Sequence, residues 1–91
     1  MSISINKISG DLFEVTVADR ITTTHTVTVT DKSLTDLTNN NVTKTQLLQF
    51  SFSFLLDREP NTSILSSFDI NIIAKYFSDY RDEVRRWCDA G

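Results

Sequence analysis

The sequence predicts an α+β domain in which a three-stranded antiparallel β-meander is packed on one face by three to four helices. Two observations lead to this prediction. Residues 2–30 alternate apolar and polar side chains with a period of two, which is typical of strands with one buried face. Residues 43–60 form the most apolar segment and carry the start and stop signals of a helix. No linker or low-complexity tract divides the chain, so we expect a single domain over residues 1–91, with the meander over 2–30 and a helical part over 32–88.

The predicted meander consists of three apolar runs. Its apolar positions recur at every second residue, and they are Ile3, Ile5, Phe13, Val15, Val17, His25, Val27 and Val29. Ser9, Gly10 and Asp11 form a turn signal between the first two runs. The alternate positions are rich in threonine, a β-branched residue that fits a pleated surface facing water. We therefore expect helices to cover one face of the sheet and solvent to cover the other.

The central apolar segment is predicted to be a helix over about residues 43–58. Thr43 and Gln46 have the spacing of a capping box, in which each side chain satisfies a free backbone N–H at the start of a helix. Pro60 cannot continue a helix, which sets the end of the segment. The alternation of polar and apolar residues over 49–54 would also suit a half-buried strand. Length, cap and stop signal together favour the helix.

This helix is expected to be buried on more than one side. Its leucine and phenylalanine side chains cover roughly two thirds of a helical wheel. Ser51 falls in the middle of that apolar arc. We interpret it as a packing residue whose hydroxyl bonds to a backbone carbonyl one turn earlier. A catalytic serine is disfavoured because no glycines of a nucleophile elbow surround it.

The remaining helical pieces are shorter. They are expected at residues 32–38, at 61–68 as a turn or short helical piece, at 70–77 and at 80–88. Asp69 is the predicted N-cap of the 70–77 helix, and Ser78 with Asp79 is the predicted break before the last one.

Composition excludes several classes of function. The chain has two glycines, one cysteine and one histidine, so we expect no phosphate-binding loop, no intrachain disulfide, no metal site and no cofactor. The net charge of −3 disfavours binding to nucleic acid or to anionic membranes. We see no signal peptide and no apolar run long enough to span a membrane, and we therefore expect a cytoplasmic protein.

His25 is the one residue that suggests catalysis, as a base or a ligand. A single histidine cannot form a metal site unaided, and its position in phase with Val27 and Val29 favours a partly buried, hydrogen-bonded packing residue. Cys88 has no histidine nearby in the sequence and is expected to be unreactive.

Two clusters of charged residues lie beside apolar ones. Residues 57–60, Asp-Arg-Glu-Pro, suit a helix C-terminus in which Arg58 favours the helix dipole; alternatively they form the polar rim of an apolar groove that receives a partner. The C-terminal segment combines Arg81, Arg85 and Arg86 with Trp87, as a nucleic-acid patch would. Acidic residues are interleaved with these arginines, which favours a salt-bridged helix face.

The segment SFSFLLDREP at 51–60, followed by SIL at 63–65 and YF at 76–77, resembles a family of small bacterial proteins without an assigned activity. Members of that family share the pattern SFxFLLxREPxxSIL after a β-hairpin. Ser78 stands where the pattern has proline. The resemblance covers about residues 11–80 and implies a helical central segment in a complete small protein. It implies no catalytic residue.

These observations predict a non-enzymatic interaction or structural protein that self-associates, because a meander leaves edge strands open and the aromatic content is high for a small core. A homodimer or another protein partner is expected. The candidate interaction residues are Arg58, Glu59, Tyr76, Tyr80 and Trp87. Two alternatives remain: a nucleic-acid-associated accessory protein using the C-terminal basic and aromatic face, and a small enzyme using His25.

Overall fold

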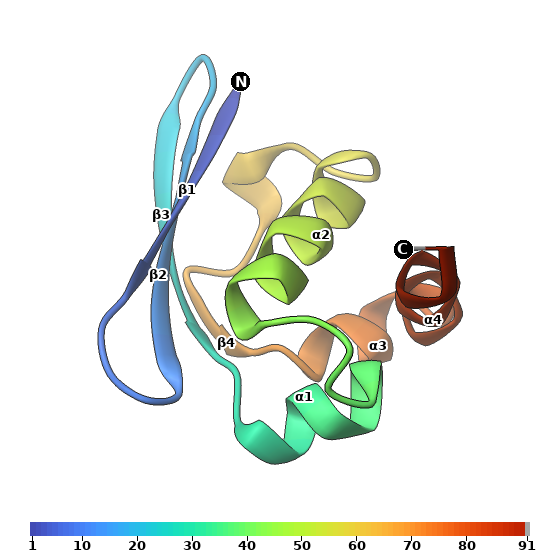
Figure 1. Ribbon diagram of the computed structural model, residues 1–91. Coiled ribbons are helices and arrows are strands. Elements are labelled where there is room, and N and C mark those ends of the chain that lie inside the picture. The colour runs from blue at the N-terminus through green and yellow to red at the C-terminus, as the bar shows by residue number, and fades with distance from the viewer. Residues whose placement is uncertain (91) are drawn as a thin grey trace.

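The computed structural model describes residues 1–90, and within that range it comprises a four-stranded mixed sheet and four α-helices (Figure 1). The strands lie in the order β1-β2-β3-β4. Their bounds are β1 Ser2–Lys7, β2 Leu12–Ala18, β3 Thr22–Thr28 and β4 Ser67–Asp69. The helices are α1 Asp31–Thr38, α2 Lys44–Leu56, α3 Ile72–Tyr76 and α4 Tyr80–Ala90, and a 3-10 turn, η1, spans Asn61–Ser63. All four helices lie on one side of the sheet (Figure 1). The α+β prediction is confirmed at this level.

The first three strands form the predicted antiparallel meander. Ile5 pairs with Val15, and Val15 pairs with His25, so that apolar positions of neighbouring strands share one face. On that face the alternate side chains of β2 and β3 pack beneath the helices, whereas Thr22, Thr24, Thr26 and Thr28 of β3 lie on the other face and are partly or fully exposed. The period of two in the sequence therefore identified the two faces of the sheet correctly.

The fourth strand corrects the prediction of a purely antiparallel three-stranded sheet. Residues 61–68 were predicted as a turn or short helical piece, but only η1 is helical and β4 runs parallel to β3. The Thr26 N–H donates to the Ser66 carbonyl at 2.8 Å, and the Ile70 N–H donates to the Thr28 carbonyl at 3.0 Å. The pairing partner of β4 lies about 40 residues away, and three residues are too few for a recognisable strand pattern.

The central segment is a helix, and the alternative of a strand over residues 49–54 was wrong. Both halves of the predicted capping box form: the Thr43 hydroxyl accepts from the Gln46 N–H at 3.1 Å, and the Thr43 N–H donates to the Gln46 side chain at 2.9 Å. The helix ends at Leu56, two residues before the predicted limit.

Helix α2 lies between the sheet and the C-terminal helices, as a helix buried on more than one side must. Towards the sheet, the Phe52 ring lies 5.4 Å from the ring of His25 and 6.2 Å from that of Phe68. Towards the last helices, the Phe54 ring lies 5.8 Å from that of Phe77 and 5.3 Å from that of Tyr80. The core is therefore two layers that share this one helix.

The start of α3 differs from the prediction. Asp69 is not the N-cap of a helix over 70–77, because Asp69 and Ile70 are held in extended pairing with β3. The helix begins at Ile72 after Asn71, whose backbone N–H donates to the Asp69 carboxylate at 2.9 Å. The break at Ser78 and Asp79 is present, and α4 then continues two residues beyond the predicted end.

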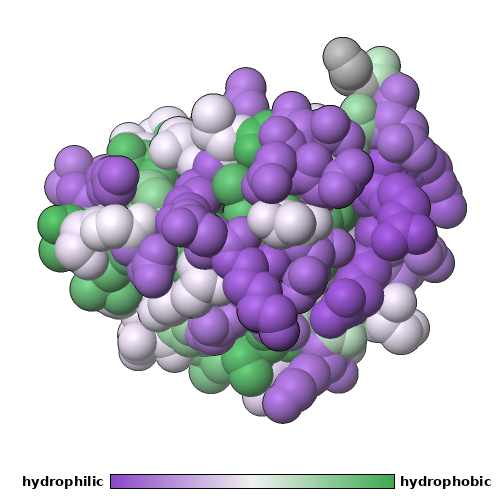
Figure 2. Space-filling view, turned by 60° about the horizontal axis from the view of Figure 1, so that its bottom comes forward, coloured by the Kyte–Doolittle hydropathy of each residue, from purple (hydrophilic) through white to green (hydrophobic). Residues whose placement is uncertain are grey.

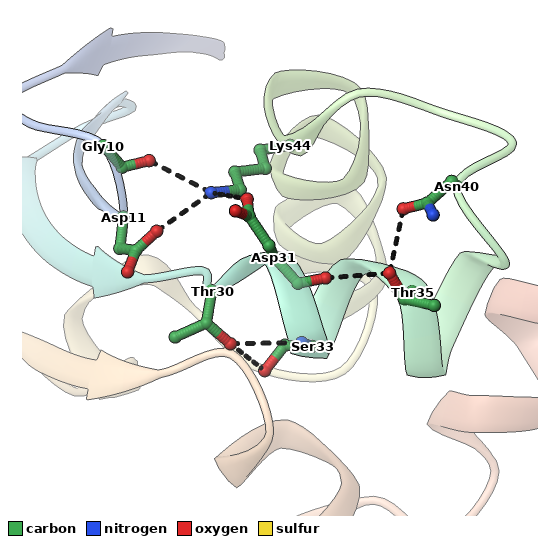
Figure 3. Close-up of polar contacts among 8 residues, drawn as sticks. All are labelled: Gly10, Asp11, Thr30, Asp31, Ser33, Thr35, Asn40 and Lys44. Carbon is green, nitrogen blue, oxygen red and sulfur yellow. Dashed lines mark hydrogen bonds and ion pairs between the residues drawn. The ribbon is translucent and has the colours of Figure 1, made fainter.

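Lys44, the first residue of α2, ties three segments together (Figure 3). Its ammonium group lies 3.0 Å from the Gly10 carbonyl, 3.0 Å from the Asp11 carboxylate and 2.8 Å from the Asp31 carboxylate. The hydrogen bond from Lys44 holds the pKa of Asp31 below its usual value, and the same bond raises the pKa of Lys44. The turn after β1, the start of α1 and the start of α2 are thus joined at one point. We call this arrangement the Lys44 clamp.

Within residues 1–90, none of the helices combines the length and the apolar character needed to cross a membrane. The same residues contain no group of three or more His, Cys, Asp or Glu side chains that could hold a metal ion.

Candidate interaction surfaces

His25 lies in the core and forms part of a chain of hydrogen bonds. Its Nδ1 lies 2.8 Å from the Leu65 carbonyl oxygen, and its Nε2 lies 2.8 Å from the Thr23 hydroxyl. The Asn61 amide donates to the same hydroxyl at 2.9 Å and to the Ile21 carbonyl at 2.8 Å. These four contacts join β3 and the turn before it to the segment that leads into β4.

The directions of these bonds assign the proton on the imidazole. A carbonyl oxygen only accepts, so Nδ1 of His25 must donate to Leu65. The Thr23 hydroxyl accepts from Asn61 and can then donate its own proton to Nε2. With a proton on Nδ1 and Nε2 as the acceptor, every member of the chain is satisfied. Both ring nitrogens are engaged, and this geometry gives His25 the role of a hydrogen-bonded packing residue.

Ser51 and Tyr80 form a second buried polar contact. Their hydroxyl oxygens lie 2.6 Å apart, and both residues are fully buried. The predicted bond from Ser51 to a carbonyl one turn earlier is replaced by this contact with α4. Burial raises the pKa of Tyr80, since it disfavours the phenolate. Tyr80 was a candidate interaction residue, and its burial places it in the core rather than on a surface.

Arg58 closes the C-terminal end of α2, as the helix-end interpretation predicted. Its guanidinium donates to the Phe54 carbonyl at 3.0 Å and to the Asp79 carboxylate at 2.8 Å. The same group lies 3.5 Å from the centre of the Phe54 ring. Through these two hydrogen bonds Arg58 links the end of α2 to the start of α4.

Glu59 and Tyr76, in contrast, lie at one apolar groove of about 350 Å³. The groove is formed by the end of α2, the segment before β4, and α3. Its other lining residues are Leu55, Ser63, Ile64, Leu65, Phe68, Ile72, Ile73 and Phe77. Tyr76 is 69% exposed and Leu65 is 48% exposed, so two large apolar side chains border the groove and contact water. The structure thus brings together two of the five candidate interaction residues.

On the C-terminal face, basic and aromatic side chains make contacts within the fold. Trp87 stacks on Phe50 with ring centres 4.6 Å apart and planes 17° apart, so part of its ring is used within the fold. Arg86 pairs with Glu83 at 3.1 Å, and Arg85 lines a polar hollow together with Asp36 and Asp89. Figure 2 brings forward the α1 end of the molecule, and the surface there is mostly hydrophilic.

Cys88 lines the same polar hollow between α1 and α4. Burial raises the pKa of its thiol, and so does the nearby carboxylate of Asp89. Both effects disfavour the thiolate, which is the reactive form of cysteine.

The outer edge of the sheet, β1, is the second candidate surface. Within the described range, β1 pairs with β2 alone, and its register runs without a bulge from Ser2 opposite Ala18 to Lys7 opposite Phe13. Ile3 and Ile5 face the helical layer but are only partly buried. Natural sheets protect such edges with prolines, bulges or several charges, and β1 has one lysine at its end.

Sequence reasoning anticipated an apolar groove beside residues 57–60, and Glu59 does line one. It did not predict the segments that form the other walls, because it missed β4. The single local signal was the polar-apolar-polar order of Ser67, Phe68 and Asp69, which is too short to distinguish a strand from a turn. The open edge of β1 was anticipated, whereas the edge of β3 is partly covered by β4.

Comparisons with known proteins add no assignment. No family model matches the sequence, and neither a curated protein nor a solved structure gives a significant match. The resemblance to the FLLxREP family therefore stays a prediction.

Proposed function

We propose that this protein is a non-catalytic interaction protein that self-associates, so that its partner is a second copy of the chain. The observation that carries this proposal is the open edge of β1. A regular six-residue strand with unpaired backbone groups and two half-buried isoleucines is a template for pairing with another strand.

The polar groups inside the molecule support a structural rather than a catalytic design. His25, Ser51 and Tyr80 carry the chemistry that an enzyme would use, and each is engaged in a buried hydrogen bond with another part of the fold. In the described residues no buried side-chain nitrogen or oxygen lacks a partner. A cytoplasmic location is part of the proposal, since a chain with one cysteine gains nothing from an oxidising compartment.

The nucleic-acid alternative is less well supported. Arg58 and Arg86 are paired with carboxylates, and Arg85 faces a hollow that also contains two acidic residues. Phosphate binding needs free cationic groups in excess of acidic ones.

Light scattering coupled to size-exclusion chromatography, over a dilution series, tests self-association. We expect the average mass to rise with concentration from the 10.4 kDa of one chain towards twice that value. A constant monomer mass at every concentration would contradict the proposal. In parallel, we expect no binding to a mixed pool of DNA and RNA oligonucleotides at low salt, where phosphate contacts are strongest. Binding there would favour the nucleic-acid alternative.

A further inference from the structure

The backbone N–H and C=O groups of alternate β1 residues point away from β2, towards the open edge of the sheet. The Ile8 N–H donates to the Leu12 carbonyl at 2.9 Å, one position beyond the pair of Lys7 with Phe13. In an antiparallel pair, hydrogen-bonded and non-hydrogen-bonded positions alternate. The even-numbered residues of β1 therefore bond to β2, and the N–H and C=O groups of Ile3, Ile5 and Lys7 point outwards.

The hydrogen bonds between β2 and β3 indicate the same alternation of inward and outward backbone groups. The Val29 N–H donates to the Asp11 carbonyl at 2.7 Å, so the odd-numbered residues of β2 bond to β3. Its even-numbered residues are left to bond to β1, which agrees with the assignment above.

From this arrangement we infer that two copies pair β1 with β1 in antiparallel orientation, with Ser4 on the two-fold axis. The inference rests on the proposed self-association and specifies its surface. The two four-stranded sheets then form one continuous eight-stranded sheet, with both helical layers on the same side. The axis is perpendicular to the sheet, so the contact is isologous and closes at two copies.

The pleat limits the possible registers. Opposed residues must point to the same face of the sheet, so the axis has to pass through a residue and not between two residues. With Ser4 on the axis, Ile3 of each copy lies opposite Ile5 of the other, which gives two isoleucine pairs on the helical side. With Ile5 on the axis, the charged Lys7 would face Ile3 instead. With Ile3 on the axis, the strand could pair only over Ser2–Ser4, and Ile5 would lie opposite a residue outside it. The Ser4 register is therefore the one that pairs both isoleucines with isoleucine within the strand.

The Ser4 register also uses the outward backbone groups. Ile3 and Ile5 become hydrogen-bonded pairs, each exchanging two backbone bonds, and the two Ser4 residues form a non-hydrogen-bonded pair between them. Two six-residue strands bury less than the roughly 1,200 Å² of a standard interface. We accordingly expect a weak dimer in exchange with monomer rather than an obligate one.

Disulfide trapping tests the register, with Cys88→Ser as the background. Two residues in a non-hydrogen-bonded pair have Cα atoms about 4.5 Å apart, and disulfides span Cα separations of about 4.4–6.8 Å. Ser4→Cys should therefore give disulfide-linked dimers under mild oxidation, read by intact mass and non-reducing gels.

Ser2→Cys is the matched control, because Ser2 lies on the same exposed face of the same strand. In the Ser4 register it lies opposite Asn6, and the two Ser2 residues are about 13 Å apart along the strand at roughly 3.3 Å per residue. We expect Ser4→Cys to cross-link at least ten times faster than Ser2→Cys.

Two further variants test whether the dimer forms through the edge of β1 or through the groove beside Tyr76. Ile3→Pro removes an outward N–H, which an edge strand tolerates, and it should abolish the dimer while circular dichroism shows a folded chain. Tyr76→Ser alters the groove, and the dimer should persist. Loss of the dimer in Tyr76→Ser alone would overturn the inference.

The outcomes distinguish this inference from the proposed function. If light scattering finds a dimer but Ser4→Cys cross-links no faster than Ser2→Cys, the β1 pairing with this register is wrong and self-association stands. If no dimer forms at any concentration, both are wrong.

Discussion

At the scale of single residues, buried polar groups in this protein are paired across long stretches of sequence. Ser51 and Tyr80 are 29 residues apart and share one hydrogen bond in the core. A phenol or a hydroxyl without a partner in such a place costs more than the bond itself is worth, because the group also loses its water. Helix α4 therefore docks on α2 at a defined position, where both hydroxyls are satisfied.

A double-mutant cycle measures this contact. Ser51→Ala and Tyr80→Phe each leave one buried hydroxyl without its partner, and each should lower the free energy of unfolding by about 1–3 kcal/mol. The double variant removes both hydroxyls, and its loss should be smaller than the sum of the single losses. Urea denaturation of the four proteins gives the values. Single losses that add to within about 0.5 kcal/mol would show that the hydroxyls do not interact.

The pattern around Ser51 predicted only part of this role. Its place in the middle of an apolar arc predicted a packing residue, and Ser51 is fully buried. The identity of the partner could not be predicted, because Tyr80 belongs to a different element with its own apolar stripe. Tyr80 was for the same reason assigned to a surface, although its hydroxyl is satisfied inside the core.

At the scale of elements, the Lys44 clamp joins the turn after β1, the start of α1 and the start of α2. The side chain of Lys44 is 15% exposed, while that of Asp31 is 94% exposed. The lowered pKa of Asp31 gives the clamp a pH dependence with a definite sign. Its contribution to stability is present above the unfolded pKa of aspartate, about 3.9, and is lost as the pH falls through the lower folded value.

Lys44→Gln should remove that dependence. We expect a lower Tm than the wild type at pH 7 and a smaller loss of Tm between about pH 5 and pH 2, since fewer folded-state carboxylates then gain from ionisation. Thermal melts monitored by circular dichroism at several pH values give the two curves. Arg86→Gln is the control, because its exposed pair with Glu83 should contribute little. Parallel curves for wild type and Lys44→Gln would contradict the assignment.

The elements that the sequence predicted well are those whose signals are local. The capping box of Thr43 and Gln46 lies within four residues, and the period of two in the meander lies within each strand. Strand β4 depends on the backbone groups of β3, about 40 residues earlier, which offer bonds to any extended segment that reaches them. That competition also moved the start of α3 from Asp69 to beyond Asn71. Pairing with a distant strand prevailed over a favourable local cap.

At the scale of the whole molecule, the candidate surfaces follow from which edges the fold covers. The edge of β3 is partly closed by β4, and the groove beside Tyr76 results from the same chain segment. The edge of β1 is left open. The sequence predicted open edges in general, since a meander always has two, but which edge stays open depends on where the 61–71 segment runs. An open edge could therefore be predicted from the sequence, and the fold identifies it as β1.

The stability of the molecule depends on the packing of α2 into both layers of the core. A substitution of Phe54 tests this dependence. Its ring contacts Phe77 before α4, Tyr80 within α4 and the guanidinium of Arg58, so that one side chain joins the central helix to the C-terminal part. Phe54→Ala should lower the free energy of unfolding by about 3–5 kcal/mol, as large-to-small changes in cores do. Chemical denaturation followed by circular dichroism gives the loss.

Thr26→Ala provides the comparison on the solvated face of the sheet. Thr26 lies opposite Glu14 and Ser67, and its contribution to β3 is made by the backbone. Its replacement should cost at most about 1 kcal/mol, the span of strand propensities. Because the second core layer is built on Phe54 and the outer face of the sheet carries no layer at all, the two losses must differ severalfold. Equal losses would mean that helix α2 is not shared between the sheet and the C-terminal helices.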